Sequence, residues 1–169
     1  MKLTTSTEHN DAFLLGAGDA KVGQIIGGSA AEGKQTKARF ISNFPGLGNL
    51  LDDLDRQIQR TGRIVLCDGT PIVVRSPHTR LGYLLQGDEN RLMKKAAILS
   101  QREIRRRALD VLKVGDIHDE WQNDAFRKHA DEFAFEVCPH AFAESGKYFN
   151  YRVPIECDAR IGLTWAETH

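Results

Sequence analysis

The sequence has no excess of positive charge, few cysteines and no long hydrophobic run. Its 23 lysines and arginines are balanced by 23 aspartates and glutamates, so any nucleic-acid contact must come from local patches. The three cysteines, Cys67, Cys138 and Cys157, are widely spaced and form no C-x-x-C pair, which argues against a disulfide framework or a zinc site. No apolar run approaches the length of a membrane span, and the polar start is unlike a signal peptide. A reducing cytoplasmic location is expected.

The chain nevertheless contains enough apolar material for a folded core. Its 169 residues are 41% hydrophobic and fall in the size range of one domain. We find no internal repeat and no low-complexity linker, so the sequence predicts one continuous unit.

The first third of the chain is expected to be helical, with one interruption. A capping box of Thr5 with Glu8 leads into a short helix near residues 12–15, and the glycine-rich stretch 16–28 predicts flexible, closely approaching backbone. Residues 30–44 suit a helix that Pro45 closes. The next helix, which Gly62 ends, carries an apolar stripe at helical spacing. This stripe consists of Leu47, Leu50, Leu51, Leu54 and Ile58.

Two hairpins and a long helix are predicted in the middle of the chain. Residues 63–67 and 71–74 flank Asp68-Gly69, a strong hairpin signal. Ser76 as N-cap and Pro77 at the first helical position open a helix that runs to about Leu109. The stretch VLKVGDIHDEWQ, residues 111–122, predicts the second hairpin.

The last part of the sequence predicts a helix and a closing strand. The helix covers about residues 124–143, and residues 148–157 alternate between apolar and polar as a half-buried strand does. The expected fold class is α+β, with a small antiparallel sheet of two hairpins plus the C-terminal strand packed against long helices. Four aromatic residues are expected in the core: Trp121, Trp165, Phe133 and Phe149.

The tip of the second hairpin carries residues that can hold metals or move protons: His118, Asp119 and Glu120. In extended backbone, adjacent side chains point to opposite faces, so Asp119 and Glu120 cannot easily ligate one ion as equals. Asp119 therefore needs a carboxylate from elsewhere, because two-metal phosphoryl chemistry uses bridging carboxylates. Alone, the triplet is a weak signal, and a chance surface cluster is the competing interpretation.

Four segments in the same order resemble the C-terminal part of family A DNA polymerases, particularly the replicative polymerases of podovirus-type phages. GAGDAKVGQIIGG (16–28) is similar to the stretch after the main fingers helix, and CDGTPIVVRSPHTRLGYLLQG (67–87) to the hairpin and helix along the primer-template minor groove. DIHDEWQ (116–122) looks like motif C, and GLTWAETH (162–169) like the family's C-terminal ending. The likeness covers about residues 12–169, and four motifs in register make it specific.

The resemblance implies an incomplete polymerase. Residues 1–62 would be a fingers-derived helical segment, and residues 63–169 a palm segment with the motif C hairpin. The implied activity is that of a DNA-directed DNA polymerase, a nucleotidyltransferase that uses Mg²⁺ in a two-metal site.

The resemblance also implies roles for individual residues. Asp119 would be the catalytic motif C metal ligand, and Glu120 its supporting acidic neighbour. His118 would contact the primer strand near its 3′ end. Gln86 would reach the minor groove, whose acceptors are common to all base pairs, with His78 about two helical turns away on the same face. Gly82 departs from the family's usual asparagine, which puts one minor-groove hydrogen bond in doubt.

Several parts of the family pattern are missing from the chain. The motif A strand with the second metal-binding aspartate would lie upstream, and the thumb and exonuclease domains are also lacking. The segment LTTSTEHNDAFLL (3–15), at the position of the fingers helix, contains no lysine or arginine for the incoming triphosphate. Leu15 replaces an aromatic residue that phage enzymes place near the template base.

Two explanations fit these missing parts. The chain is either the C-terminal piece of a split polymerase or a truncated remnant, and the encoded Met1, the capping sequence and the intact triplet favour the split. The partner chain would then supply motif A, the thumb and a cationic fingers helix, and the complex would bind primer-template DNA and dNTP in the cytoplasm of a host cell. A catalytically inactive DNA-binding accessory subunit and a metal-dependent phosphohydrolase are the alternatives.

Overall fold

The computed structural model of the chain describes residues 16–117 and 119–168. The predicted capping box of Thr5 with Glu8, the short helix near residues 12–15 and His118 lie outside these ranges. The chain divides into two compact units, one ending at Gly87 and the other beginning at Asp88. The predicted boundary between fingers and palm segments after residue 62 stays a prediction, because compact units of a fold need not coincide with functional segments.

The first unit begins with two helices in close contact, α2 (Asp19–Ile25) and α3 (Ala30–Asn43). The predicted flexible stretch 16–28 is therefore wrong in part, since seven of its residues form α2. The backbones of α2 and α3 approach closely: a Cβ atom on Gly33 of α3 would lie 2.1 Å from the carbonyl oxygen of Asp19. A Cβ atom on Gly23 would lie 2.2 Å from the carbonyl oxygen of Ser29. The expectation of closely approaching backbone is confirmed.

The predicted helix after Pro45 is present as α4 (Pro45–Thr61), and Gly62 ends it in the left-handed conformation with φ 68°. Proline suits the first helical position because its missing N–H would have no partner there. The α4 stripe faces a core with the following strands. This first core consists of Leu51, Leu54, Ile64, Val74 and Leu81.

The first predicted hairpin is confirmed as β1 (Arg63–Val65) paired antiparallel with β2 (Pro71–Val73). Its turn uses Gly69 at φ 83°, a conformation that residues with a side chain rarely adopt. The carboxylate of Asp68 accepts a hydrogen bond from the backbone N–H of Thr70 at 2.9 Å. The turn is thus closed by the chemistry that its two residues predict.

The long helix begins slightly later than predicted. A 3₁₀ turn over Pro77–Thr79 precedes α5 (Arg80–Arg106), which the units share. His78 lies in the 3₁₀ turn and Gln86 in α5, so the argument that they are two α-helical turns apart does not hold. Because the two helix types rotate by different angles per residue, a shared face does not follow from their spacing.

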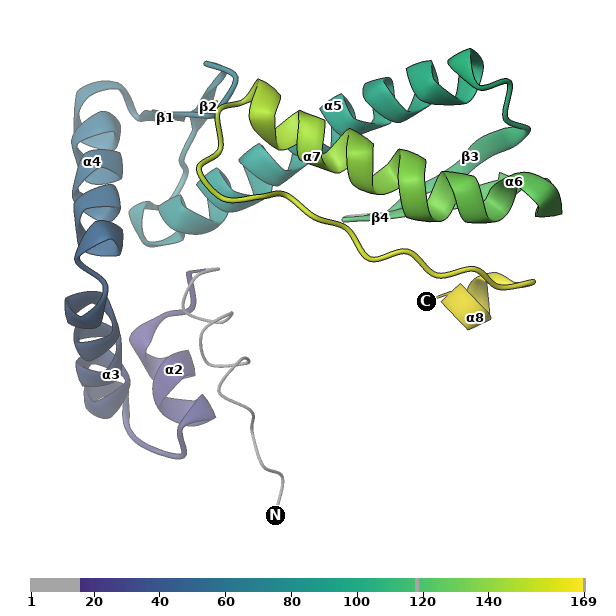
Figure 1. The fold of residues 1–169 in the computed structure, drawn as a ribbon. Helices are drawn as coiled ribbons and strands as arrows, with labels where there is room; N and C mark the ends of the chain where they lie inside the picture. Colours follow the sequence, from purple (N-terminus) through teal and green to yellow (C-terminus); the bar gives the residue numbers. More distant parts are fainter. Residues whose placement is uncertain (1–15, 118, 169) are drawn as a thin grey trace. The chain divides into compact units, whose positions relative to one another are not determined.

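The second unit combines a hairpin with a continuous helical run (Figure 1). Strand β3 (Val111–Ile117) pairs antiparallel with β4 (Glu120–Ala125), and the register shifts between Lys113 and Gly115. The helical run consists of α6 (Arg127–Glu132), a π-helical stretch over Phe133–Val137, and α7 (Cys138–Tyr148). Its core consists of Ile104, Leu109, Val111, Phe133, Val137 and Cys138.

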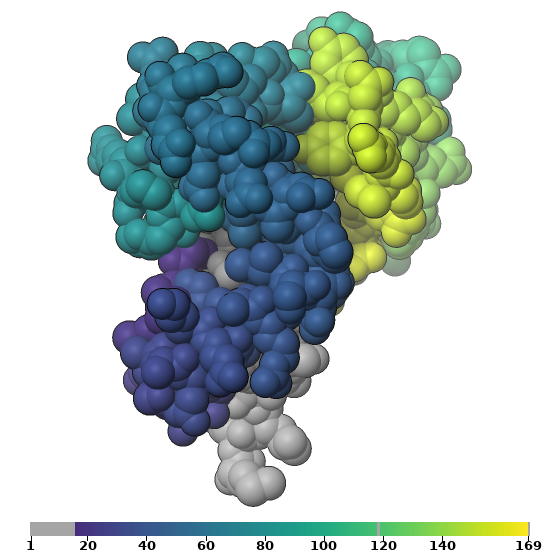
Figure 2. Space-filling model, turned by 90° about the vertical axis from the view of Figure 1, so that its left-hand side faces the viewer, coloured from purple at the N-terminus to yellow at the C-terminus, as the bar shows by residue number. Residues whose placement is uncertain are grey.

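The predicted strand over residues 148–157 is wrong. Tyr148 ends α7, and residues 149–164 contain no helix or strand. This segment, here called the strap, runs alongside α7 in Figure 1 and is exposed at the surface of the second unit in Figure 2. A Cβ atom on Gly146 would lie 2.6 Å from Cγ1 of Ile155, so the strap packs closely on α7. Ile155 of this alternating segment thus meets a helix instead of a neighbouring strand, whereas Val153 is 63% exposed.

The fold is α+β, as predicted, but the described strands form two separate two-stranded hairpins. Two of the aromatic expectations need comment. Phe133 is buried as predicted, whereas Trp165 is 52% exposed on α8 (Trp165–Thr168), so its assignment to the core is wrong. Within residues 16–117 and 119–168, no helix is both long and apolar enough to cross a bilayer.

Candidate active-site hairpin

The β3–β4 hairpin places Asp119 at its turn. Ile117 pairs with Glu120 as the last pair of the register, which leaves residues 118 and 119 between the strands. The side chain of Asp119 is exposed. Asp119 forms no hydrogen bond or ion pair with another residue that the structure describes. An exposed carboxylate at a turn is accessible to a ligand that approaches from outside the chain.

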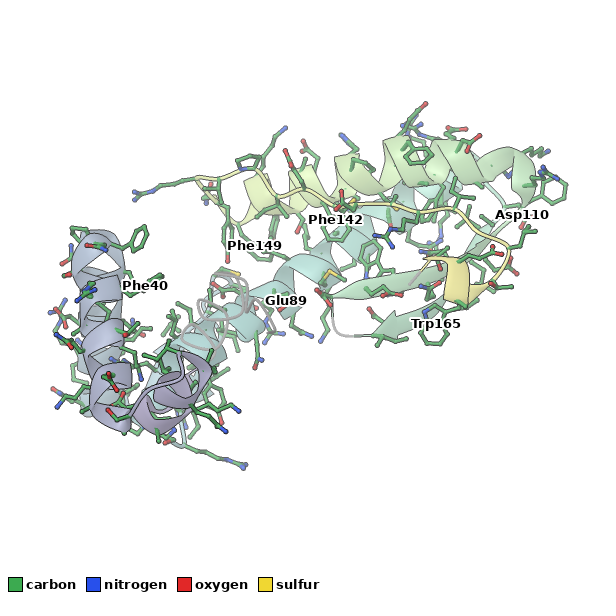
Figure 3. The ribbon with its side chains drawn as sticks, turned by 90° about the horizontal axis from the view of Figure 1, so that it is seen from below. Phe40, Glu89, Asp110, Phe142, Phe149 and Trp165 are labelled. Atoms are coloured by element: carbon green, nitrogen blue, oxygen red, sulfur yellow. The ribbon has the colours of Figure 1, made fainter. Side chains whose placement is uncertain are left out.

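The other acid at the tip has a different environment. Glu120 begins β4 and is half-buried. Its Oε1 accepts hydrogen bonds from Trp165 Nε1 at 3.2 Å and from the side-chain amide of Gln122. Figure 3 shows Trp165 on α8 beside the hairpin. The structure therefore separates the two carboxylates by environment, with Asp119 exposed and Glu120 held by side chains.

A third acid lies on the same hairpin. Asp116 forms an ion pair with Lys113 at 2.9 Å, and Nζ of Lys113 lies 5.2 Å from the centre of the Trp121 ring. In the described part of the chain, no three His, Cys, Asp or Glu residues are grouped so that they could hold a metal ion. The described residues thus provide single oxygen ligands but no complete set.

The predicted DNA contacts fall on both units. His78 and Gln86, both exposed, belong to the first unit, and Nδ1 of His78 lies 2.8 Å from Oγ of Ser76. Gly82, which replaces the family's asparagine, is buried in α5. His118 lies outside the described residues. The roles of His78, Gln86 and His118 in DNA binding stay predictions.

Sequence reasoning missed the contacts that the C-terminal residues make with β4. Trp165 bonds Glu120, and Oγ1 of Thr168 lies 3.3 Å from Oε1 of Gln122. The sequence does contain one signal for such a contact, a tryptophan in a polar C-terminal segment. The indole N–H of a partly covered tryptophan usually donates to an acceptor. That signal does not identify the acceptor.

Comparisons with known proteins identify what the chain resembles. No family model matches it. The DNA-directed DNA polymerase of Escherichia phage Phieco32 is 34% identical over 167 residues, which cover 94% of this chain and 26% of that protein. The DNA-directed DNA polymerase of Escherichia phage T7 is 27% identical over 177 residues, covering 93% of this chain and 25% of that protein. The chain therefore spans about a quarter of the length of these relatives.

A solved structure supports the same relation at the level of the fold. It is the POL domain of Pol1 from M. smegmatis in complex with DNA primer-template and dNTP. The TM-score is 0.72 at 15% identity, and the match covers 92% of this chain and 28% of that one. The predicted resemblance is confirmed: nearly the whole of this chain is related to a segment of the DNA-directed DNA polymerases of T7-like phages, and that segment makes up about a quarter of their length.

Proposed function

We propose that the chain forms part of a family A DNA-directed DNA polymerase, in which Asp119 binds a catalytic metal ion and other residues contact primer-template DNA. The observation that carries this proposal is the relation to phage DNA polymerases over 94% of the chain. The exposed position of Asp119 at a hairpin turn supports it. Because the chain spans 26% of its relative's length, the rest of the enzyme comes from polypeptide outside this sequence, which we propose is a separate partner chain.

The described residues fit one side of a two-metal site. Mg²⁺ is commonly held by one or two carboxylates, with water and substrate phosphates completing its octahedral shell. Asp119 supplies one such carboxylate, and the partner would supply the second from motif A. When bound, a pair of divalent ions stabilises both the attacking and the leaving oxygen of phosphoryl transfer. Glu120, in this proposal, supports Asp119 without being an equal ligand.

The DNA contacts in this proposal involve side chains that can donate hydrogen bonds. The exposed amide of Gln86 donates to minor-groove acceptors, which are similar in all base pairs and permit recognition of shape without sequence. In this proposal, His78 also contacts the DNA, and His118 contacts the primer near its 3′ end. Such contacts position a template without selecting its sequence.

The surface of the hairpin supports a missing partner. Leu112 and Val114 on β3 are 66% and 63% exposed, and Phe126 beyond β4 is 56% exposed. Exposed apolar groups in one region mark interaction surfaces, and a strand edge without a neighbour favours pairing with another chain. In the described part of the chain, the β3–β4 sheet has only two strands. A partner segment packed beside β3 would cover Leu112 and Val114.

Reconstitution tests the proposal. The chain is co-expressed with the polypeptide from the same genome that carries the remaining polymerase segments, and primer extension is measured with Mg²⁺. Asp119→Asn should lower the rate of extension at least about 100-fold, as is usual when one group that stabilises charge in the transition state is removed. DNA binding should be retained. Asp116→Asn is the matched control, because Asp116 is an acid on the same hairpin that is paired with Lys113.

Two results would overturn the proposal. Extension by the purified chain without any partner would show that the missing segments are not needed. Unchanged extension by the Asp119→Asn complex would show that the carboxylate is not catalytic, and the chain would then be a DNA-binding accessory subunit.

A further inference from the structure

The short helix α8 is joined to β4 by side-chain hydrogen bonds at two positions. Nε1 of Trp165 donates to Oε1 of Glu120 at 3.2 Å, and the hydroxyl of Thr168 lies 3.3 Å from Oε1 of Gln122. This hydroxyl also lies 3.1 Å from the carbonyl oxygen of Trp165, so its single proton is shared between two acceptors. Glu120 and Gln122 are two residues apart on a strand and therefore lie on the same face.

The opposite face of β4 packs on α7. The ring of Trp121 lies 4.9 Å from that of Phe142, centre to centre, and Figure 3 shows Phe142 on α7. Because Trp121 points toward α7, its neighbours on either side point the other way, toward α8. The strand thus has an apolar face against a helix and a polar face that the C-terminal residues cover.

The polar contacts form one connected chain from α8 to the acid beside Asp119. The side-chain amide of Gln122 donates to the same Oε1 of Glu120 that accepts from Trp165. An ionised carboxylate only accepts hydrogen bonds, so both N–H groups suit it. The order is Thr168 hydroxyl, Gln122 amide, Glu120 carboxylate and Trp165 indole.

Apolar burial contributes little to the placement of α8 within the described residues. Leu163 is 93% exposed and Trp165 is 52% exposed. A helix of four residues is not stable by itself, because the conformational entropy lost in forming the first turn exceeds the stabilisation from its hydrogen bonds. The turn before it is closed by the backbone N–H of Leu163, which donates to Glu167 at 2.5 Å. The bonds to Glu120 and Gln122 are therefore among the contacts that hold α8 against the hairpin.

We propose that α8 is a positioning element of the candidate active site. Trp165 and Thr168 are positioning residues that fix the Glu120 side chain and, through it, the turn that carries Asp119. Hydrogen bonds to an ionised group are the stronger ones, and they hold the carboxylate in one orientation. A displacement of about 1 Å in such a site is enough to lower the rate substantially. The inference rests on the proposed function for its catalytic consequence but not for the contact itself.

The contact is tested without activity, by NMR of the full chain. The sequence has two tryptophans, so it gives two indole N–H signals, and Trp165→Phe assigns them. Glu120→Gln should shift the Trp165 signal because its acceptor loses its charge, and Thr168→Val should shift it less. The matched control is Glu156→Gln, an exposed acid on the strap, which should leave the signal in place. If the Trp165 signal does not shift in either Glu120→Gln or Thr168→Val, the inference is overturned.

The catalytic consequence is tested in the complex with the partner chain. Trp165→Phe should lower the extension rate about tenfold, the usual scale for partners of metal-binding groups, and raise the Mg²⁺ concentration for half-maximal rate. DNA affinity should stay within about twofold, because these side chains act on the acid and not on the DNA. Thr168→Ser, which keeps the hydroxyl, should retain the wild-type rate that Thr168→Val loses.

The outcomes separate the two hypotheses. A purely structural role for α8 would lower the yield of complex and leave the Mg²⁺ requirement of the remaining enzyme unchanged, which would overturn the positioning role. A wild-type complex that does not extend primers would overturn the proposed function, while the indole signals would still decide whether α8 holds Glu120.

Discussion

The two hairpins of the chain have the same topology and very different surroundings. In β1–β2, Ile64 is fully buried, and Leu66 and Val74 beside the strands are 5% and 8% exposed. In β3–β4, Val111 reaches the core at one end, whereas Leu112 and Val114 are 66% and 63% exposed. The shorter hairpin thus has one well-covered face, although Val65 and Val73 on its other face are 50% and 58% exposed.

This difference shows which hairpin has an apolar face that its own unit buries. One face of the β1–β2 hairpin packs on α4 and the start of α5, so Ile64 and Val74 are covered within the first unit. The β3–β4 hairpin is longer, has an irregular register between Lys113 and Gly115, and carries Asp119 at its turn. Register irregularities are frequent next to active sites, where they redirect side chains. In the proposed function, the first hairpin supports the fold and the second carries the metal-binding residue.

The largest effect is expected from a cavity in the covered hairpin. Ile64→Ala removes a fully buried side chain and should lower the free energy of unfolding by about 2–5 kcal/mol, the usual cost of such a truncation. Far-UV circular dichroism in urea measures it, because both tryptophans lie in the second unit and their fluorescence does not report on the first.

The matched control for this prediction is the next residue on the same strand. Val65 is 50% exposed, so Val65→Ala should change the free energy of unfolding by no more than about 0.5 kcal/mol. Equal destabilisation by the two variants would show that β1 is not covered as described, and the contrast between the hairpins would disappear.

A smaller effect is expected in the second unit, where charges join α5 to the helices over the hairpin. Arg107 bonds Glu132 and Glu136 at 2.9 Å each, and Glu103 accepts from both Arg106 and Arg107. The hydrogen bond from Arg106 is the main cause that lowers the pKa of Glu103 from 4.5 to about 2. Because the folded-state pKa is lowered, the stabilisation is complete above pH 4.5 and is lost as pH falls through about 2.

Glu103→Gln tests this dependence on pH. The variant should have a lower urea midpoint than the wild type at pH 6. The two midpoints should approach each other as the pH falls toward 2 and meet below it, as followed by tryptophan fluorescence. Glu156→Gln, at an exposed acid of the strap, serves as the control and should follow the wild type. A constant difference between Glu103→Gln and wild type across this range would contradict the assigned pKa.

The sequence was sufficient for elements whose signals are local. Pro45 after the preceding helix, Gly62 at the end of α4 and the Asp68-Gly69 turn each act through their own backbone, and the helix ends and the turn are confirmed. Glycines misled the prediction at α2, because a glycine that permits a loop also permits two helices to touch. Only the position of α3 relative to α2 shows that Gly23 and Gly33 serve contact.

The parts that could not be predicted depend on distant partners. Alternation over residues 148–157 is typical of a strand, but a strand forms only where a neighbour offers its backbone, and here the neighbour is α7. Asp119 was identifiable as a candidate ligand from its triplet and the family resemblance. Its support by α8 was not, because Trp165 and Glu120 are 45 residues apart in the sequence.

The smallest effect on folding, and a direct test of the contrast between the hairpins, is expected from the exposed pair on β3. The double substitution Leu112→Ser with Val114→Ser removes apolar groups that are already in water. The free energy of unfolding of the second unit should therefore change by no more than about 0.5 kcal/mol. Self-association in analytical ultracentrifugation should fall, because less apolar surface is offered to a second copy. Binding of the partner chain should weaken, since the same groups would be buried there. If instead the variant unfolds readily, these side chains are part of a core and the second hairpin needs no partner.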